Sequence, residues 1–289
     1  MPASEARECK RTQWATRTVL RMCELLAMSS RRATELNVSL QTLAAHSAGA
    51  STTRDGWGVG FYQGNDVALF REPTAASDSP LARFLQTQGL STTLAISHIR
   101  HATRGAVDLS NTQPFVRELA GRVHAFAHNG NLVGIERAGN LDFDRYRPVG
   151  TTDSEHAFCA LLERIHGLWN PASAPPPLEQ RRSAVAEFAA DLCRLGPANF
   201  LYSDGEVLFA HGHRRIHAAS GRIAPPGLCL WSCHCADPDG PVHASGVTVA
   251  PGFQEMVLVA SVPLTGEAWR PLGEGELVVV SAGRVVDGL

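Results

Sequence analysis

The sequence predicts an α+β protein in which sheets stack on one another and are covered by helices. Three observations support this class. The predicted strands occur in groups with helices between the groups, and from residue 199 onward the chain is almost entirely short strands. The one glycine-rich stretch, residues 56–60, lies inside a strand pattern and does not form a phosphate-binding loop. This order favours stacked sheets over a doubly wound parallel sheet.

Apolar alternation predicts the elements of the first half of the chain. The spacing predicts a helix over residues 35–46. The predicted strands there, including a hairpin of two, cover residues 23–28, 57–63, 67–71, 94–99 and 123–128. A further helix precedes residues 94–99 in the predicted order.

The second half begins with a strong helix signal. Thr152-Asp153-Ser154-Glu155 is a capping box, and apolar residues follow it at helical spacing. Residues 170–177 contain three consecutive prolines and are predicted to be a surface loop. A second helix follows over about residues 179–195. Five short strands complete the chain, at residues 200–203, 207–210, 228–232, 256–260 and 277–281.

Composition excludes several classes of function. At 44% apolar and 19% charged residues, the chain is typical of a soluble globular protein. A formal net charge of -2 gives no basic field for nucleic-acid binding. No run of about 18 apolar residues exists, so no membrane span is expected.

The seven cysteines do not form the even, regular pattern of a secreted disulfide framework, so the cytoplasm is the expected compartment. Cys233-His234-Cys235 lacks the spacing of a zinc site and is interpreted as a strand with alternating faces. Nothing in the sequence indicates a metal, and no nucleotide or other cofactor is expected.

Cys23 is the first candidate for chemistry, because it directly follows Met22 and Met-Cys is a start from which a cell can produce an N-terminal cysteine. The pKa of a cysteine thiol is about 8.5 and that of an α-amine about 7.7 to 8.0, so the amine can accept the thiol proton near neutrality. Nucleophile and base would then share one residue. For Cys23 alone, a small buried cysteine in the first strand is the commoner explanation.

Residues 1–22 lack the apolar stretch of a secretory signal, and their two glutamates count against a transit peptide. Two interpretations remain. The segment is a pro-segment cleaved before Cys23, or the start is mis-assigned and Met22 is the true initiator. We favour the second, which leaves residues 23–289 as one domain with C-terminal strands.

Four polar clusters fall at strand ends, where a rigid scaffold can hold them. They are Arg54-Asp55-Gly56-Trp57-Gly58, the segment from His98 to Gly105, Ala127-His128-Asn129-Gly130-Asn131, and Thr152-Asp153-Ser154-Glu155. Together with Met22-Cys23-Glu24-Leu25-Leu26, the chain resembles a class II glutamine amidotransferase, and within that class the stand-alone YafJ-type proteins. The resemblance runs from Cys23 nearly to the C-terminus. It implies the αββα sandwich of N-terminal-nucleophile hydrolases, in which two antiparallel sheets lie between helices.

The resemblance also implies roles for individual residues. Arg100 would hold the α-carboxylate of glutamine, with Thr103 beside it, and Asp153 would pair with the α-ammonium group. Asn129 and Gly130 would form the oxyanion hole through a side-chain amide and a backbone N–H. Each has a structural alternative, since Arg100 could form a surface salt bridge, Asn-Gly is a common hairpin turn and Asp153 fits a capping box.

Other residues of the pattern are expected to shape the pocket. Gly56, Trp57 and Gly58 resemble the family segment beside the glutamine site, where glycines permit close backbone approach. Arg104 and Gln113 stand where relatives often carry histidine, which leaves the fine positioning of the substrate open.

The histidines near these clusters are interpreted as orienting or core residues, because their spacing in extended segments does not converge on a metal. They include His98, His101 and His128. His211-Gly212-His213 and His217 are interpreted in the same way and placed in a turn.

The implied chemistry is attack of the Cys23 thiolate on the side-chain amide of glutamine or of a γ-glutamyl compound. Ammonia or an amine leaves, and water releases glutamate from the thioester. With no second catalytic domain in the chain, a separate acceptor protein would take the ammonia, or the enzyme would be a hydrolase, as relatives in ergothioneine synthesis and glutathione breakdown are. The alternative is a non-catalytic module that senses an amino acid or binds a partner while residues 1–22 mask Cys23.

Overall fold

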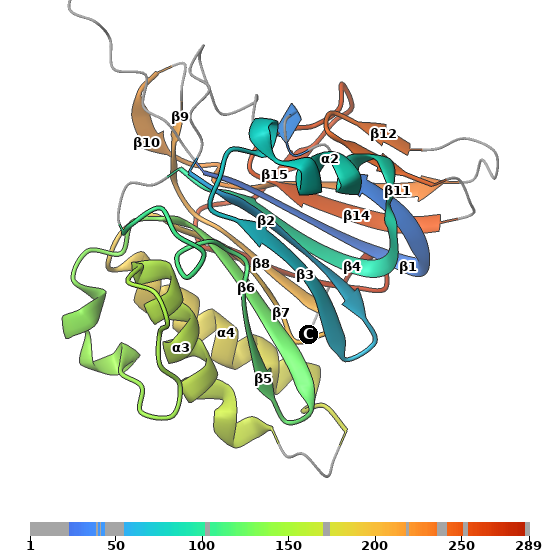
Figure 1. Cartoon of the computed structure of the whole chain (residues 1–289). Coiled ribbons are helices and arrows are strands. Elements are labelled where there is room, and N and C mark those ends of the chain that lie inside the picture. Colours follow the sequence, from blue (N-terminus) through green and yellow to red (C-terminus); the bar gives the residue numbers. More distant parts are fainter. Residues whose placement is uncertain are drawn as a thin grey trace, which may run out of the picture.

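The structure is a computed structural model of the whole chain (Figure 1). It describes residues 23–38, 40, 42–43, 55–101, 105–169, 174–217, 220–235, 242–250 and 254–286. The expectations for residues 1–22, Arg54, Thr103 and Arg104 lie outside the described residues.

The larger sheet, sheet A, contains nine strands among the described residues, and all of its pairs are antiparallel. Its main order is β15-β11-β14-β1-β4-β2-β3, with β13 pairing to β1 and β12 to β13. The strands are β1 (Glu24–Val38), β2 (Trp57–Gln63), β3 (Asp66–Glu72), β4 (Leu90–Ile99), β11 (Cys229–Cys235), β12 (Val242–Ala244), β13 (Val247–Val249), β14 (Gln254–Ala260) and β15 (Arg270–Pro271). The strand that follows Cys23 is therefore central.

In the described part of the chain, sheet B has six strands, also antiparallel, in the order β17-β16-β8-β7-β6-β5. They are β5 (Phe115–Leu119), β6 (Arg122–Gly130), β7 (Ala198–Ser203), β8 (Leu208–Gly212), β16 (Glu276–Ser281) and β17 (Arg284–Val285). A separate small pair joins β9 (Arg215–His217) to β10 (Arg222–Ala224).

Helices cover the outer faces of both sheets, as Figure 1 shows. The helix α2 (Pro80–Thr87) lies on sheet A, and α3 (Asp153–Ile165) and α4 (Leu178–Cys193) lie on sheet B. Short 3-10 turns flank them at Ala76–Asp78, Ile135–Arg137, Gly139–Leu141 and His166–Leu168. None of the helices in the described part of the chain is long and apolar enough to cross a membrane.

Strand alternation explains the layers. In β6, Ala125 and Ala127 face the core between the two sheets, whereas Phe126 faces the helices and stacks on Phe158 of α3 with ring centroids 5.4 Å apart. Three apolar cores result, one between the sheets and one under each helical layer. The predicted four-layer αββα sandwich is confirmed.

The helix predicted over residues 35–46 is wrong at its start, because β1 continues to Val38. Leu36 and Val38 alternate into the core under α2 and pair with β4 and β13. Among the described residues that follow, Leu40, Thr42 and Leu43 are helical. Leu36, Leu40 and Leu43 are spaced like one face of a helix, and this spacing led to the prediction of a helix where the strand continues.

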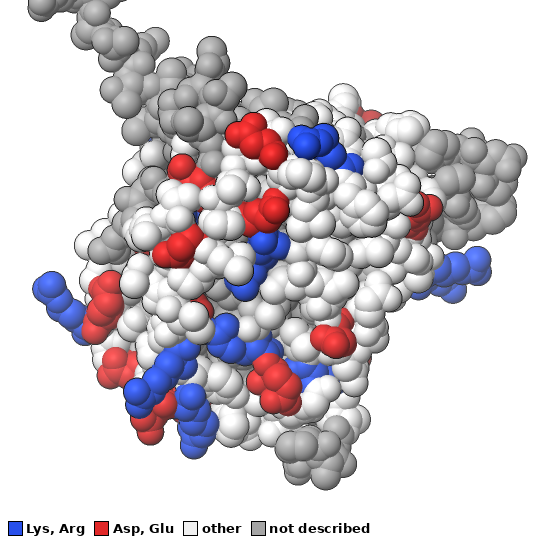
Figure 2. All heavy atoms as spheres, in the orientation of Figure 1, with Lys and Arg blue, Asp and Glu red and all other residues white. Residues whose placement is uncertain are grey.

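Charged side chains of both signs lie interspersed on the face drawn in Figure 2. Arg145 pairs with Glu163, and Arg164 with Asp191, over the helices of sheet B. This face carries no extended field of one sign.

Candidate functional site

Cys23 lies where two central strands of sheet A meet. It directly precedes β1, and the antiparallel register pairs Glu24 with Ile99 at the end of β4. The chain leaving β4 therefore passes beside Cys23. The backbone N–H of His101 donates to the Cys23 Sγ over 3.1 Å, and the Sγ lies 3.4 Å from the His101 carbonyl oxygen.

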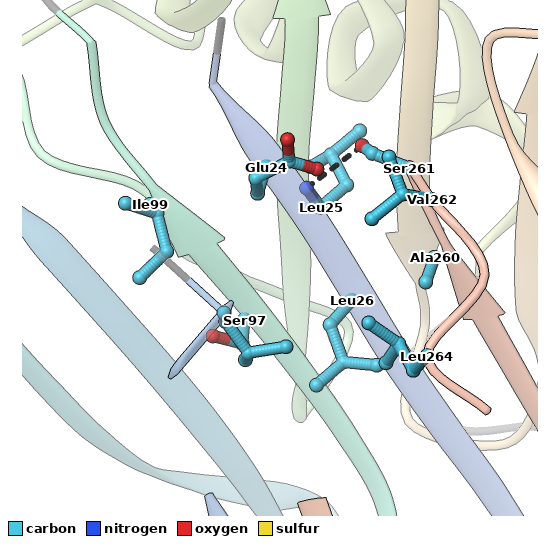
Figure 3. A pocket seen from close by; sticks show the side chains of 10 residues that line it. Glu24, Leu25, Leu26, Ser97, Ile99, Ala260, Ser261, Val262 and Leu264 are labelled. Atoms are coloured by element: carbon cyan, nitrogen blue, oxygen red, sulfur yellow. Dashed lines mark hydrogen bonds between the residues drawn. The ribbon is translucent and has the colours of Figure 1, made fainter. Parts of the chain in front are cut away.

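The start of β1 is fixed by bonds to neighbouring segments (Figure 3). The Leu25 N–H donates to the Ser261 hydroxyl over 3.0 Å, and the Ser261 N–H donates to the Leu25 carbonyl over 3.0 Å. Glu24 forms a buried ion pair with Arg215 over 3.1 Å. A cavity of about 10 Å³ beside these residues has room for about one water molecule. Glu24 and Leu25, which directly follow Cys23, are therefore held firmly in place.

Asn129 and Gly130 end β6 of sheet B and reach Cys23 from the opposite sheet. Asn129 lies on the same face of β6 as Ala125 and Ala127, which points its side chain between the sheets. Its Nδ2 donates to the Cys23 carbonyl oxygen over 2.6 Å. Residues 106 positions apart in the chain thus meet at one point.

Gly130 is exposed, and its backbone passes very close to the residue just before β7. A Cβ added at Gly130 would lie 1.8 Å from the Pro197 carbonyl oxygen. No side chain fits there without a backbone shift. Glycine is thus required by packing at the position where the predicted backbone donor lies.

The Cys23 thiol is a free thiol whose environment favours its neutral form. The residue keeps some solvent contact, but protein atoms crowd its sulfur. Burial raises the pKa of Cys23 to about 11, and the charges of Glu24 and Asp55 add to the rise. The His101 N–H and the Arg100 charge act in the opposite direction. In this chain the Cys23 nitrogen is an amide that follows Met22, so it provides no base for the thiol.

Arg100 is buried close to Cys23. Its guanidinium donates to the carbonyl oxygens of Asp55 over 3.5 Å and Gly105 over 3.4 Å. Backbone bonds in both directions tie it to the segment before β2: its N–H donates to the Gly56 carbonyl, and the Asp55 N–H donates to its carbonyl. The predicted carboxylate-binding cation is thus held close enough to act on the pKa of Cys23.

Asp153 is the first residue of α3, and Thr152 is the N-cap that accepts from the Glu155 N–H. One carboxylate oxygen of Asp153 accepts from the Leu132 N–H over 2.8 Å, and the other from the Ser154 N–H over 2.9 Å. Leu132 is two residues past Gly130. Asp153 therefore begins the helix and also anchors the loop that directly follows the predicted oxyanion donors.

The predicted pocket-shaping segment lies at the start of β2. Gly56 has a φ of 140°, which favours glycine. Trp57 is fully buried in the core under α2. A Cβ at Gly58 would lie 2.2 Å from the Gln113 carbonyl oxygen, so this glycine admits the neighbouring chain.

His98 and His128 are buried near the site, and burial favours the neutral form of both rings. Burial lowers the pKa of His98 to about 3, and it lowers the pKa of His128 in the same direction. The His128 Nδ1 lies 2.9 Å from the Ser154 hydroxyl, and the His101 Nδ1 lies 3.6 Å from the Asp55 carboxylate. Within the described residues, no group of three or more His, Cys, Asp or Glu side chains could hold a metal.

The turn predicted at His211-Gly212-His213 is wrong. His211 and Gly212 belong to β8, and both histidines are buried. The His211 Nδ1 lies 2.7 Å from the Ala198 carbonyl oxygen, and the His213 Nδ1 accepts from the Ala198 N–H. Both rings satisfy the backbone at the start of β7, and His217 lies in β9.

Three residues of the site have structural roles that the sequence did not assign. Gln113 bonds the backbone of His128, Asn199 donates to the Asn129 carbonyl over 3.1 Å, and Arg215 pairs with Glu24. Gln113 carried a signal, since it departs from the family pattern. The other two contacts connect distant strands and have no local signature.

The chain is similar to known proteins over most of its length. Residues 22–288 match the family model of the class II glutamine amidotransferases. The YafJ protein of Escherichia coli (strain K12), itself assigned to the glutamine amidotransferases by inference, is 35% identical over 256 residues, which are 88% of this chain and 96% of YafJ.

Solved structures show the same architecture. A crystal structure from Pseudomonas aeruginosa PA01, titled as a predicted glutamine amidotransferase, superposes with a TM-score of 0.66 at 32% identity, covering 92% of this chain and all of that one. The glutamine phosphoribosylpyrophosphate amidotransferase of Bacillus subtilis shares the fold with a TM-score of 0.55 at 17% identity, over 91% of this chain and 48% of its own. The chain belongs to the class II glutamine amidotransferases.

Proposed function

We propose that this protein hydrolyses the side-chain amide of glutamine or of a γ-glutamyl compound, with Cys23 as the nucleophile. The proposal depends on the contact between Cys23 and Asn129, which come from opposite sheets. The Asn129 amide nitrogen lies 2.6 Å from the Cys23 carbonyl oxygen. The Asn129 amide has two N–H groups, of which this contact uses one. The second remains for an oxyanion that forms beside the sulfur.

The mechanism follows from a terminal Cys23. Its α-amine takes the thiol proton, and the sulfur attacks the amide carbon of the substrate. The oxyanion is stabilised by Asn129 and by the Gly130 N–H. The intermediate collapses as the protonated α-amine gives its proton to the leaving nitrogen, and ammonia or an amine departs. Water then attacks the thioester, the amine takes and returns a proton, and glutamate and the free thiol are restored.

We assign the binding of the substrate's head group to Arg100, Thr103 and Asp153. Arg100 offers a planar fork that suits a carboxylate, and Asp153 offers the charge that an α-ammonium group needs. The released ammonia goes to solvent or to a separate acceptor protein, and the proposal places the protein in the cytoplasm. The assay is glutamate release from glutamine and from γ-glutamyl peptides by protein expressed from Met22 with a confirmed Cys23 terminus. Absence of release from every substrate would contradict the proposal.

Arg100→Ala is expected to raise KM by about 10- to 100-fold with a smaller change in kcat, because a charge-assisted hydrogen bond to the substrate contributes about 1.5–3 kcal/mol. Arg100→Lys keeps the positive charge but lacks the planar guanidinium that can donate two parallel hydrogen bonds, and it should give an intermediate KM. The matched control is Arg181→Ala, which removes a buried arginine that pairs with Asp204 over 2.8 Å. That variant should lose stability and keep its KM. An unchanged KM in folded Arg100→Ala would contradict the assignment.

A further inference from the structure

Gln113 has no role in the mechanism above, yet it is buried next to the residues that carry the mechanism. Only 6% of its surface is exposed. It lies two residues before β5, at the edge of sheet B where β5 pairs with β6. The sequence position of Gln113 does not indicate that it lies near Asn129 and Gly130. The structure brings it beside them.

The side-chain amide of Gln113 bonds both backbone groups of one residue. The His128 N–H donates to the Gln113 Oε1 over 2.6 Å, and the Gln113 Nε2 donates to the His128 carbonyl oxygen over 3.2 Å. On β6 the pairing with β5 begins at Phe126, opposite Phe115. The side chain of Gln113 therefore adds one more pair of hydrogen bonds to the β5–β6 ladder. It fixes the backbone of His128, the residue that directly precedes Asn129.

Sheet A holds Gln113 in turn. Because Gly58 has no side chain, the Gln113 carbonyl can pack against its backbone. A Cβ at Gly58 would lie only 2.2 Å from the Gln113 carbonyl oxygen. Arg71 of β3 donates to the carbonyl oxygens of Thr112 over 2.7 Å and Pro114 over 3.5 Å. The segment around Gln113 thus rests on β2 and β3 while its amide reaches across to β6.

These contacts close a ring around the site. Sheet A holds Cys23 directly before β1 and supports the segment around Gln113 on β2 and β3. Gln113 fixes the backbone of His128, and the next residue, Asn129, returns to Cys23 through its amide. From this ring we infer that Gln113 is a positioning residue that sets the oxyanion donors Asn129 and Gly130 relative to the sulfur. The inference rests on the proposed function.

The test is Gln113→Met, which keeps the length and buried volume of the side chain and removes both hydrogen bonds. kcat should fall about 10- to 100-fold, because displacement of a catalytic group by about 1 Å costs on the order of 100-fold. KM should change by less than about threefold, since the head-group residues are held by other contacts. Hydrogen exchange at the His128 amide should accelerate while the rest of β6 stays protected.

The matched control is Gln63→Met. Gln63 of β2 also donates to a backbone carbonyl, that of Ser91 over 2.8 Å, but it is exposed and lies at the opposite end of β2 from Trp57 and Gly58. This variant should keep kcat, KM and exchange at His128. Wild-type kcat in Gln113→Met would overturn the inference, as would a loss of activity that only follows a loss of global stability. If the wild type released no glutamate, the proposed function would fail, and exchange at His128 would still decide whether Gln113 holds that backbone.

Discussion

Cys23→Ala is expected to reduce glutamate release by at least about 1,000-fold, because loss of a covalent nucleophile leaves only binding and oxyanion stabilisation. The variant should fold, since Cys23 lies just before β1 and outside the apolar cores. The neighbouring strand stays anchored by the bonds of Leu25 to Ser261 and by the Glu24–Arg215 pair. Unchanged thermal unfolding together with lost turnover is therefore the expected result.

The control for this prediction is Cys193→Ala. Cys193 is also a free, partly exposed thiol, and its sulfur lies 3.8 Å from the His211 Nε2, which resembles a cysteine–histidine pair. Burial raises the pKa of Cys193 and lowers that of His211 to about 4, so proton transfer between them is unfavourable. Cys193→Ala should keep full activity. A γ-glutamyl electrophile should label Cys23 and not Cys193, and labelling of Cys193 with retained activity in Cys23→Ala would contradict the assignment.

The fold could be predicted largely from the sequence because its signals are local. Alternation gave the hairpin of β2 and β3, and the capping box gave the start of α3 at Thr152. The error at residues 35–38 has the same origin, since a short apolar run fits a helix and a strand equally until its partners are known. β13 and β4 supply those partners, and both come later in the chain.

The residues that the structure brings close to Cys23 could be named from the sequence, but the electrostatics around its sulfur could not. Resemblance named Cys23, Arg100, Asn129 and Asp153, and the structure brings the first three together and joins Asp153 to the loop after Gly130. The rise in the pKa of Cys23 comes from burial, which depends on packing between distant strands. The position of Gln113 depends on a glycine in another strand, so no pattern within its own segment indicates it.

Exposure of Cys23 as the first residue is expected to increase activity by at least about 100-fold over the chain that retains residues 1–22. With its nitrogen in a peptide bond, the Cys23 thiol has a pKa of about 11. A thiol with that pKa is ionised in only about one molecule in 3,000 at pH 7.5. A terminal α-amine, with a pKa of about 7.7 to 8.0, supplies a base beside the sulfur and removes this limit.

The two forms should differ in the shape of their pH profiles as well as in rate. Because the thiolate is the reactive species and the pKa of Cys23 is raised, activity of the longer form should rise about tenfold per pH unit and continue rising above pH 9. Activity of the form that begins at Cys23 should follow deprotonation of the amine and level off near pH 8. Glutamate release from pH 6 to 10, with intact mass confirming each terminus, measures both curves.

The same comparison separates the enzyme from a sensor. If the cellular protein begins at Cys23 and its profile levels off as described, the sulfur and its own amine act together. If the cellular protein retains residues 1–22 and releases no glutamate while still binding glutamine, the pocket serves recognition and the masked module is the correct interpretation. Equal rates and equal pH profiles for the two forms would show that a base other than the α-amine activates Cys23. Among the described residues, the neutral histidines with lowered pKa values are poor candidates for that base, because burial opposes the positive charge that they would have to accept.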